Sequence, residues 1–338
     1  MAEKKTAASQ LFSFGKSARN PFLFQKEGVS RIFPRRTGCP GAGFSGMIGR
    51  REVRGMAIRL IATDMDDTLL GPGGELSERT KAAVAEAMRR GVLFALASGR
   101  MPQAMRETAT QLQVNCPAIA YNGGMIADLA GGTVVRSWPV PQGLAREAAK
   151  IAEELGGHVQ AYKNGTYYFA ENNEYARAYG DSIRLYGQEA GEKLSKWFTG
   201  DADKLLVIGQ PEQISQWVLK MQAHFGERLS CAVSRPNYIE VFRSGVDKAV
   251  ALQELAASYG LKPDEVAAFG DGENDLGMVQ WAGHGYIMAN ARPQVLAKAP
   301  AIAPSNAQDG LAQVLEQWFE NGMIPESSSY AQRREAEQ

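Results

Sequence analysis

Cysteine and histidine are scarce in this sequence, with three of each among 338 residues. Cys39, Cys116 and Cys231 lie far apart, and none belongs to a Cys-x-x-Cys or Cys/His ligand pattern. An odd number of widely spaced cysteines excludes a disulfide framework and a structural zinc site, and is typical of a reducing compartment. We therefore expect a cytoplasmic protein, and we assign no role to the histidines, which lie in unrelated segments.

Long apolar runs and a net charge are also missing. No run reaches the roughly 18 apolar residues that a transmembrane helix needs, so we expect no membrane segment. Lys and Arg number 37, as do Asp and Glu. Residues 1–55 contain eleven Lys and Arg against three Glu, which is 11 − 3 = +8, so the remaining chain carries −8. An acidic body argues against binding to nucleic acid phosphates.

The first 55 residues differ from the rest of the chain. They are rich in Arg, Gly, Ser, Phe and Pro and show no sustained periodicity, so we expect a disordered basic extension, or residues upstream of the true start at Met56. A targeting segment is the weaker alternative, because its Pro and Gly content interrupts an amphipathic helix. The Gly-x-Gly-x-x-Gly run at 41–46 lacks the flanking strand and helix that would cradle a phosphate.

From Met56 onward, the composition is that of a folded core, and apolar runs alternate with amphipathic segments. The runs at 57–64, 92–98, 117–123 and 266–272 predict strands, and those at 75–91, 101–113, 247–260, 274–283 and 309–322 predict helices. Continuous apolar strands that alternate with helices indicate an α/β fold. We expect a Rossmann-like, doubly wound parallel sheet with helices on both faces.

This alternation is interrupted between residues 141 and 242. The strands predicted there mix apolar and polar residues, as in an antiparallel sheet with one face in water. We therefore expect a core formed by residues 56–140 and 243–322, with an inserted α+β domain at 141–242. Residues 323–338 are expected to be a solvated tail.

Oxygen-bearing side chains follow three of the predicted core strands. Asp64 and Asp66 follow the run IRLIA, while Ser98 follows VLFALA and Asp271 follows VAAFG. Each lies at the carboxyl end of a predicted parallel strand, which is the edge where open α/β sheets bind ligands. Packing does not require polar side chains at three strand ends, so this edge predicts a functional site.

Carboxylates dominate this edge, and they predict a metal site formed by Asp64, Asp66, Asp271 and Asp275. Such hard oxygen ligands suit Mg²⁺, which is held by a few carboxylates and bridges to phosphate. Each Asp could instead be an N-cap or turn former, and for Asp67 alone we prefer that structural interpretation. Like charges as close as Asp64 and Asp66 need a cation nearby.

The same residues resemble the motifs of a known family. DMDDTLL resembles the DxDxT signature of the haloacid dehalogenase (HAD) superfamily of phosphotransferases. ASGR, Lys248 in SGVDKAVAL and GDGENDLGM resemble the second, third and fourth motifs, in order. YNGG, IMANA and the long insertion resemble the Cof-type branch, which has a large α/β cap of the C2 type. The resemblance covers nearly all of residues 57–320.

This resemblance implies a role for each motif residue. Asp64 would be the nucleophile that forms an aspartyl-phosphate. Asp66 would be the general acid and then the general base, with its backbone carbonyl rather than its side chain touching the metal. Thr68 would help to hold the loop. Lys248 would pair with the nucleophile and the phosphate, and its place near a helix N-terminus, where a cation is unfavourable, supports a function.

The remaining motif residues would bind the phosphate or the metal. Ser98 would donate its hydroxyl to a transferring phosphoryl oxygen beside the Gly99 amide. Asn274 would contact the phosphate. Asp271 would ligate Mg²⁺, and Asp275 would orient metal waters or Lys248.

Three residues have two open interpretations. Asn122 in YNGG reaches the site or simply forms a turn before two glycines. Arg100 contacts substrate or cap, or forms a structural ion pair. Asn290 likewise has either a functional or a structural interpretation.

The function that the resemblance implies is that of an Mg²⁺-dependent phosphatase, a phosphoric monoester hydrolase that acts on small phosphorylated metabolites such as sugar phosphates or a flavin phosphate. A phosphomutase or phosphotransferase is the alternative among enzymes. A phosphoryl-accepting regulatory module is the alternative of another class, but it needs neither the acid Asp66 nor a large cap. No nucleic acid or membrane partner is expected, and the oligomeric state is left open.

Overall fold

A computed structural model describes residues 57–326 of the protein. The expected basic extension at 1–55 and its glycine run lie outside the described residues, as does most of the expected C-terminal tail. The described chain begins just before the first strand and ends just after the last helix.

The centre of the fold is a five-stranded parallel sheet. Its strands are β1 (Leu60–Thr63), β2 (Leu93–Leu96), β12 (Val266–Gly270), β13 (His284–Met288) and β14 (Ile302–Ala303), in the order β14-β13-β12-β1-β2. All four pairings are parallel. β1 and β12 are buried along their whole length, because apolar residues on both faces meet helices.

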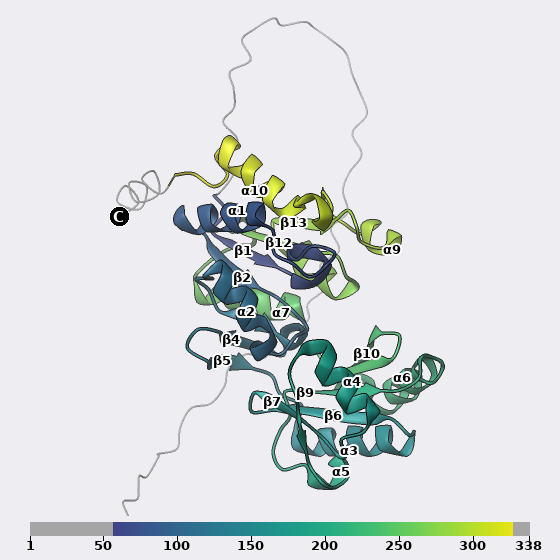
Figure 1. The fold of residues 1–338 in the computed structure, drawn as a ribbon. Coiled ribbons are helices and arrows are strands. Elements are labelled where there is room, and N and C mark those ends of the chain that lie inside the picture. The colour runs from purple at the N-terminus through teal and green to yellow at the C-terminus, as the bar shows by residue number, and fades with distance from the viewer. Residues whose placement is uncertain (1–56, 327–338) are drawn as a thin grey trace, which may run out of the picture. The chain divides into compact units, whose positions relative to one another are not determined.

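Helices cover both faces of this sheet (Figure 1). α1 (Glu78–Arg89), α2 (Pro102–Leu112) and α10 (Gly310–Asn321) contribute to the hydrophobic cluster on one face. α7 (Lys248–Ser258), α8 (Leu276–Trp281) and the short α9 (Pro293–Leu296) contribute to the cluster on the other. The predicted fold class, a doubly wound α/β core with an inserted α+β region, is confirmed.

The third predicted strand is shorter than expected and begins a different sheet. β3 (Ala118–Ala120) joins the parallel sheet only through a bridge between Ala97 and Ile119. It pairs with β4 (Met125–Asp128), which pairs with β5 (Thr133–Ser137), in an antiparallel three-stranded sheet. Every residue of β5 is exposed, and its sequence, TVVRS, does not alternate apolar with polar residues as the pattern that predicts a strand would.

The insert, residues 141–242, contains a six-stranded mixed sheet in the order β10-β11-β9-β6-β7-β8, whose strand β11 runs one residue into the core segment. Its strands are β6 (His158–Lys163), β7 (Thr166–Phe169), β8 (Gln188–Glu189), β9 (Lys204–Ile208), β10 (Leu229–Arg235) and β11 (Tyr238–Arg243). Its helices are α3 (Gln142–Glu154), α4 (Glu174–Ile183), α5 (Leu194–Trp197) and α6 (Pro211–Phe225). α3, α5 and α6 share one hydrophobic cluster with the sheet, whereas Ala176 of α4 belongs to another.

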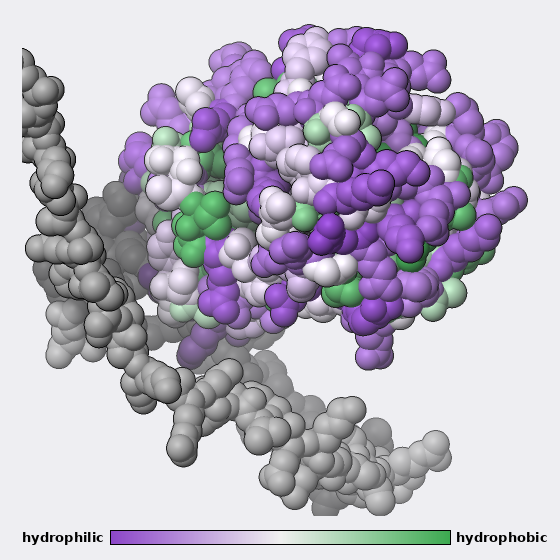
Figure 2. Space-filling view, turned by 90° about the horizontal axis from the view of Figure 1, so that it is seen from below, coloured by the Kyte–Doolittle hydropathy of each residue, from purple (hydrophilic) through white to green (hydrophobic). Residues whose placement is uncertain are grey.

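Surface features add little to this picture. On the face in Figure 2, hydrophobic residues form small separate areas among hydrophilic ones. Such scattered apolar residues are ordinary on protein surfaces and need no partner to explain them. Within residues 57–326, no helix is both long and apolar enough to cross a membrane.

Ser77, the N-cap of α1, links two helices. Ser77 Oγ accepts a hydrogen bond from the Thr80 amide at 3.1 Å and donates one to Asp309 Oδ1 at 2.6 Å, just before α10. We expect Ser77→Ala to lower the free energy of unfolding by about 1–2 kcal/mol, since it removes a cap and a bond to a charged group. Urea unfolding measures this change. Ser182→Ala is the control, because Ser182 is exposed and bonds only within its own helix; equal losses in both variants would contradict the prediction.

Candidate active site

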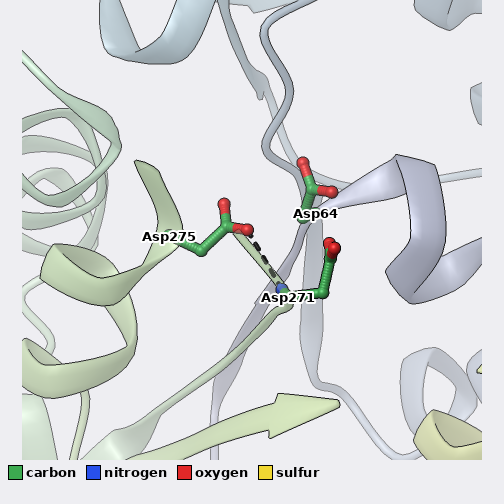
Figure 3. Close-up of side chains that lie close together, drawn as sticks. All are labelled: Asp64, Asp271 and Asp275. Atoms are coloured by element: carbon green, nitrogen blue, oxygen red, sulfur yellow. Dashed lines mark hydrogen bonds between the residues drawn. The ribbon is translucent and has the colours of Figure 1, made fainter. Parts of the chain in front are cut away.

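Three carboxylates meet at the carboxyl ends of β1 and β12 (Figure 3). Asp64 directly follows β1, and its amide donates to the carbonyl of Phe269 on β12 at 2.9 Å. Asp271 directly follows β12, and Asp275 lies in the short turn after it. One oxygen from each of the three carboxylates lies within 4.8 Å of the others. The predicted edge of the sheet therefore does gather these carboxylates.

Lys248 provides the positive charge inside this cluster. It is the first residue of α7 and is fully buried, and its Nζ donates to Asp64 Oδ1 at 2.5 Å and to Asp275 Oδ1 at 2.6 Å. With all three carboxyl groups ionised, the single ammonium would leave two negative charges in this largely buried place. Such an excess is costly without a further cation, so the donor set fits a hard divalent ion such as Mg²⁺.

The electrostatics of the individual groups agree with this interpretation. Burial raises the pKa of the Asp64 carboxyl well above its usual range. Lys248 lowers this pKa, whereas the negative charges of Asp275 and Asp271 raise it further. Burial, with a contribution from Asp275, also raises the pKa of Asp271 to about 6. Burial opposes the charged form of Lys248, but the carboxylates of Asp275 and Asp64 outweigh it and raise the pKa of this lysine.

Backbone and hydroxyl donors orient the acidic side chains. Asp275 Oδ2 accepts from the amides of Asp271 at 3.1 Å and Gly272 at 2.9 Å. Gly270 allows this turn, because a Cβ there would lie 2.3 Å from the Cβ of Asp275. Thr68 Oγ1 donates to Asp271 Oδ1 at 3.0 Å, so the predicted loop residue contacts a predicted metal ligand.

Asp66 lies beside the cluster, and its side chain points to a different partner. Arg100 Nε donates to Asp66 Oδ2 at 2.9 Å, and a second guanidinium nitrogen donates to Oδ1. The Asp66 side chain is 51% exposed and that of Arg100 is 38% exposed. Of the two interpretations of Arg100, the structure supports the ion pair, and its partner is the predicted general acid. A half-exposed carboxylate two residues from Asp64 is accessible to a ligand.

The predicted phosphate-binding residues also converge. Ser98 is buried, and its Oγ accepts from the Arg100 amide at 3.2 Å. The Asn122 amide donates to the Ser98 carbonyl at 3.0 Å, and Asn122 Oδ1 accepts from Asn274 Nδ2 at 3.1 Å. Asn122 thus forms a turn with positive φ and also lies beside Asn274, another predicted site residue, so its position is compatible with both interpretations. A Cβ on Gly99 would lie within 3.0 Å of this Asn122 amide group.

The Asn290 side chain bonds to the backbone of two loops. Its Nδ2 donates to the backbone carbonyl of Asp67 at 2.7 Å, and its Oδ1 accepts from the Asn306 amide at 3.0 Å. These bonds tie the turn after β1 to the segment after β14. Asp67 itself has a φ of +58° and an exposed side chain, in keeping with its interpretation as a turn residue.

Three further residues near the site were not singled out from the sequence. Gly123 has a φ of +102°, and a Cβ there would lie 2.1 Å from the carbonyl oxygen of Asp247. Asp247 caps α7 by accepting from the Val250 amide at 2.9 Å. Lys204, from the insert, donates to the Gly99 carbonyl at 3.3 Å. A lysine opening an otherwise apolar strand, as in KLLVIG, was the available signal for Lys204.

Comparison with known proteins agrees with this geometry. Residues 61–315 match the model of the haloacid dehalogenase-like hydrolase family. This match spans most of the chain, so the protein belongs to that family, and the predicted resemblance and the predicted hydrolase class are confirmed.

Individual relatives are similar over nearly their whole length. A pyridoxal phosphate phosphatase of Escherichia coli is 28% identical, over 77% of this chain and 98% of the relative. A 5-amino-6-(5-phospho-D-ribitylamino)uracil phosphatase of Bacillus subtilis is also 28% identical, over 77% and 96%. Among solved structures, a Thermotoga maritima protein has a TM-score of 0.70 at 29% identity, over 77% of this chain and 97% of that one.

The close approach of Gly123 to α7 generates a prediction. We expect Gly123→Ala to lower the free energy of unfolding by about 3 kcal/mol or more, because a side chain there is strained and collides with the Asp247 carbonyl. The collision also displaces Lys248, so hydrolysis of an aryl phosphate should fall. Thermal unfolding and initial rates measure the two effects.

The matched control lies at the other end of the same helix. Gly260 follows α7 with a φ of +66°, but a Cβ there has no atom within 4 Å. Gly260→Ala therefore adds backbone strain of about 1 kcal/mol without a collision. If both variants lost the same stability and activity, contact between Gly123 and Asp247 would have no special importance.

Proposed function

We propose that this protein is an Mg²⁺-dependent phosphatase that hydrolyses small phosphorylated metabolites through an aspartyl-phosphate intermediate. The observation that carries the proposal is the contact of the buried Asp64 with Lys248, beside Asp271 and Asp275, at the end of a parallel strand. Membership of the haloacid dehalogenase-like hydrolases supports it. That membership also argues against a regulatory module that only accepts a phosphoryl group.

In the first step, an Asp64 oxygen attacks phosphorus, and the bond from phosphorus to the ester oxygen breaks. Asp66 donates its proton to the leaving oxygen, so the alcohol departs neutral. In the second step, Asp66 takes a proton from a water molecule that attacks the same phosphorus. The bond to Asp64 breaks, which releases inorganic phosphate and restores the carboxylate. Asp66 is half-exposed and so can exchange protons with water and the leaving group, whereas the buried Asp64 is held at the phosphorus.

Neighbouring residues hold the phosphoryl group during both steps. The Ser98 hydroxyl, the Gly99 amide and the Asn274 side chain donate to its oxygens, and Lys248 offsets negative charge next to the nucleophile. Asn122 supports this set by its bond to Asn274. Arg100 pairs with Asp66 while that carboxylate is ionised, and this pair has to open when Asp66 carries the proton that it donates.

The metal fits beside these residues. The side chains of Asp64, Asp271 and Asp275, together with the backbone carbonyl of Asp66, would hold it. When bound, Mg²⁺ would supply positive charge that offsets the charge of the transferring phosphoryl group.

We propose further that residues 56–140 and 243–322 form the catalytic core and that the insert is the cap. The cap would exclude water during the first step and contact the leaving group. Two relatives are named as phosphatases of pyridoxal phosphate and of a phosphoribitylamino uracil, which supports a small phosphate ester as the substrate here. The alternative of a phosphomutase requires a second hydroxyl to take the place of water.

The assignment of Asp64 as the nucleophile is tested by removing its negative charge. We expect Asp64→Asn to lower hydrolysis of p-nitrophenyl phosphate by at least about a thousandfold, because an amide does not form the aspartyl-phosphate. Steady-state release of nitrophenol measures it. Asp67→Asn is the matched control, since Asp67 is exposed and three residues away, and its rate should stay within about twofold of the original. Retention of most activity by Asp64→Asn would overturn the assignment.

The metal assignment predicts an effect on stability as well as on activity. We expect millimolar Mg²⁺ to raise the melting temperature, because a ligand at about 100 times its Kd stabilises a protein by about 2.7 kcal/mol. Excess EDTA should abolish hydrolysis. Asp271→Asn should remove most of the shift in melting temperature, measured against KCl of matched ionic strength. An unchanged shift in that variant would place the metal elsewhere.

A further inference from the structure

A buried lysine of the insert reaches the core beside the site. Lys204 opens β9 and is only 3% exposed. Its Nζ donates to Glu240 Oε2 on β11 at 2.7 Å and to the backbone carbonyl of Gly99 in the core at 3.3 Å. A buried ammonium is costly unless its donors are satisfied, so this position is unlike that of an ordinary surface lysine.

Aromatic rings surround the same ammonium. Nζ lies 4.7 Å from the ring centre of Tyr162 and 5.7 Å from those of Tyr121 and Phe242. Tyr162 is the partner of Lys204 across the β6–β9 pairing, so the two side chains share one face of the sheet. Rings at these distances stabilise a cation and keep water away from it. The direction of Nζ is therefore well determined, and it points to Gly99.

The Gly99–Arg100 peptide connects this lysine to Ser98. The carbonyl of that peptide accepts from Lys204, and its amide, which belongs to Arg100, donates to Ser98 Oγ at 3.2 Å. Because Oγ accepts from this amide, the hydroxyl keeps its own hydrogen for another acceptor. A charged donor at one end of a peptide also polarises the donor at its other end. Glycine at 99 leaves the peptide free to rotate unless something anchors its carbonyl.

We propose that Lys204 is a positioning residue that acts through the Gly99–Arg100 peptide to aim the Ser98 hydroxyl at the transferring phosphoryl group. Glu240 and the surrounding rings hold Lys204 in the required direction. The insert would thus contribute to the chemistry of the core and not only to contacts with the leaving group. This inference rests on the proposed function, in which Ser98 donates to a phosphoryl oxygen.

A double-mutant cycle tests the inference, with kcat/KM for p-nitrophenyl phosphate as the readout. We expect Ser98→Ala to lower kcat/KM by about a hundredfold and Lys204→Met by about tenfold. If Lys204 acts through Ser98, the double variant should fall by about a hundredfold only, since the hydroxyl that Lys204 positions is already gone. Inhibition by inorganic phosphate should weaken in Lys204→Met. A fall of about a thousandfold in the double variant, or no fall in Lys204→Met, would overturn the inference.

Two controls separate positioning from stability. Lys163→Met changes a lysine of the same sheet whose Nζ donates to the Thr199 carbonyl within the insert, so its activity should match that of the original protein. If Lys204→Met melts early because Glu240 is left unpaired, the paired change Lys204→Met with Glu240→Gln replaces it in the cycle, and the original protein stays the reference, so that neither charge is left without its partner. Failure of the original protein to hydrolyse any phosphate ester would defeat the proposed function, whereas additive losses defeat only the role of Lys204.

Discussion

The ammonium of Lys248, buried between Asp64 and Asp275, is the interaction on which the site depends. Each of the three charges alone would be costly at this depth, and each makes the others tolerable. The contact joins the end of β1, which precedes the insert in sequence, to the start of α7 and the turn after β12, which both follow it. The contact therefore requires the two parts of the core, before and after the insert, to come together. The remaining negative charge is what makes the place suitable for a divalent cation.

Glycines allow the backbone segments to come close enough for that contact. Gly123 lets the turn after β3 touch the carbonyl of Asp247, immediately before Lys248. Gly270 leaves room for Asp275 to fold back over the end of β12 and accept from two backbone amides. The Asn-Gly-Gly run at 122–124 and the Gly-Asp-Gly run at 270–272 thus have the same structural effect. They remove side chains at the points where the elements bearing Lys248 and Asp275 approach their neighbours.

Much of the core could be predicted from the sequence, because buried parallel strands are continuous apolar runs and polar residues at their ends are conspicuous. Asp64 and Asp271 are of this kind, and the N-cap Ser77 has a local signal. The hairpin of β4 and β5 has no such signal, because β5 is wholly exposed. The contacts of Arg100 with Asp66 and of Asn122 with Asn274 depend on packing between distant segments, which no local pattern records. The roles predicted for these residues stay predictions until variants are measured.

Three consecutive residues after β2 show how the site combines local and distant constraints. Ser98 is tied to the core through Ile119 and Asn122, Gly99 to the insert through Lys204, and Arg100 to the turn after β1 through Asp66. Neither of the two cations involved, Lys204 and Arg100, belongs to the carboxylate cluster that Lys248 occupies. Both act on the same short loop, Lys204 through the Gly99 carbonyl and Arg100 through its own side chain. Asp66 contacts this loop through the Arg100 side chain, and Ser98 begins it, so the proposed proton donor and a proposed phosphoryl-binding hydroxyl both depend on the position of residues 98–100.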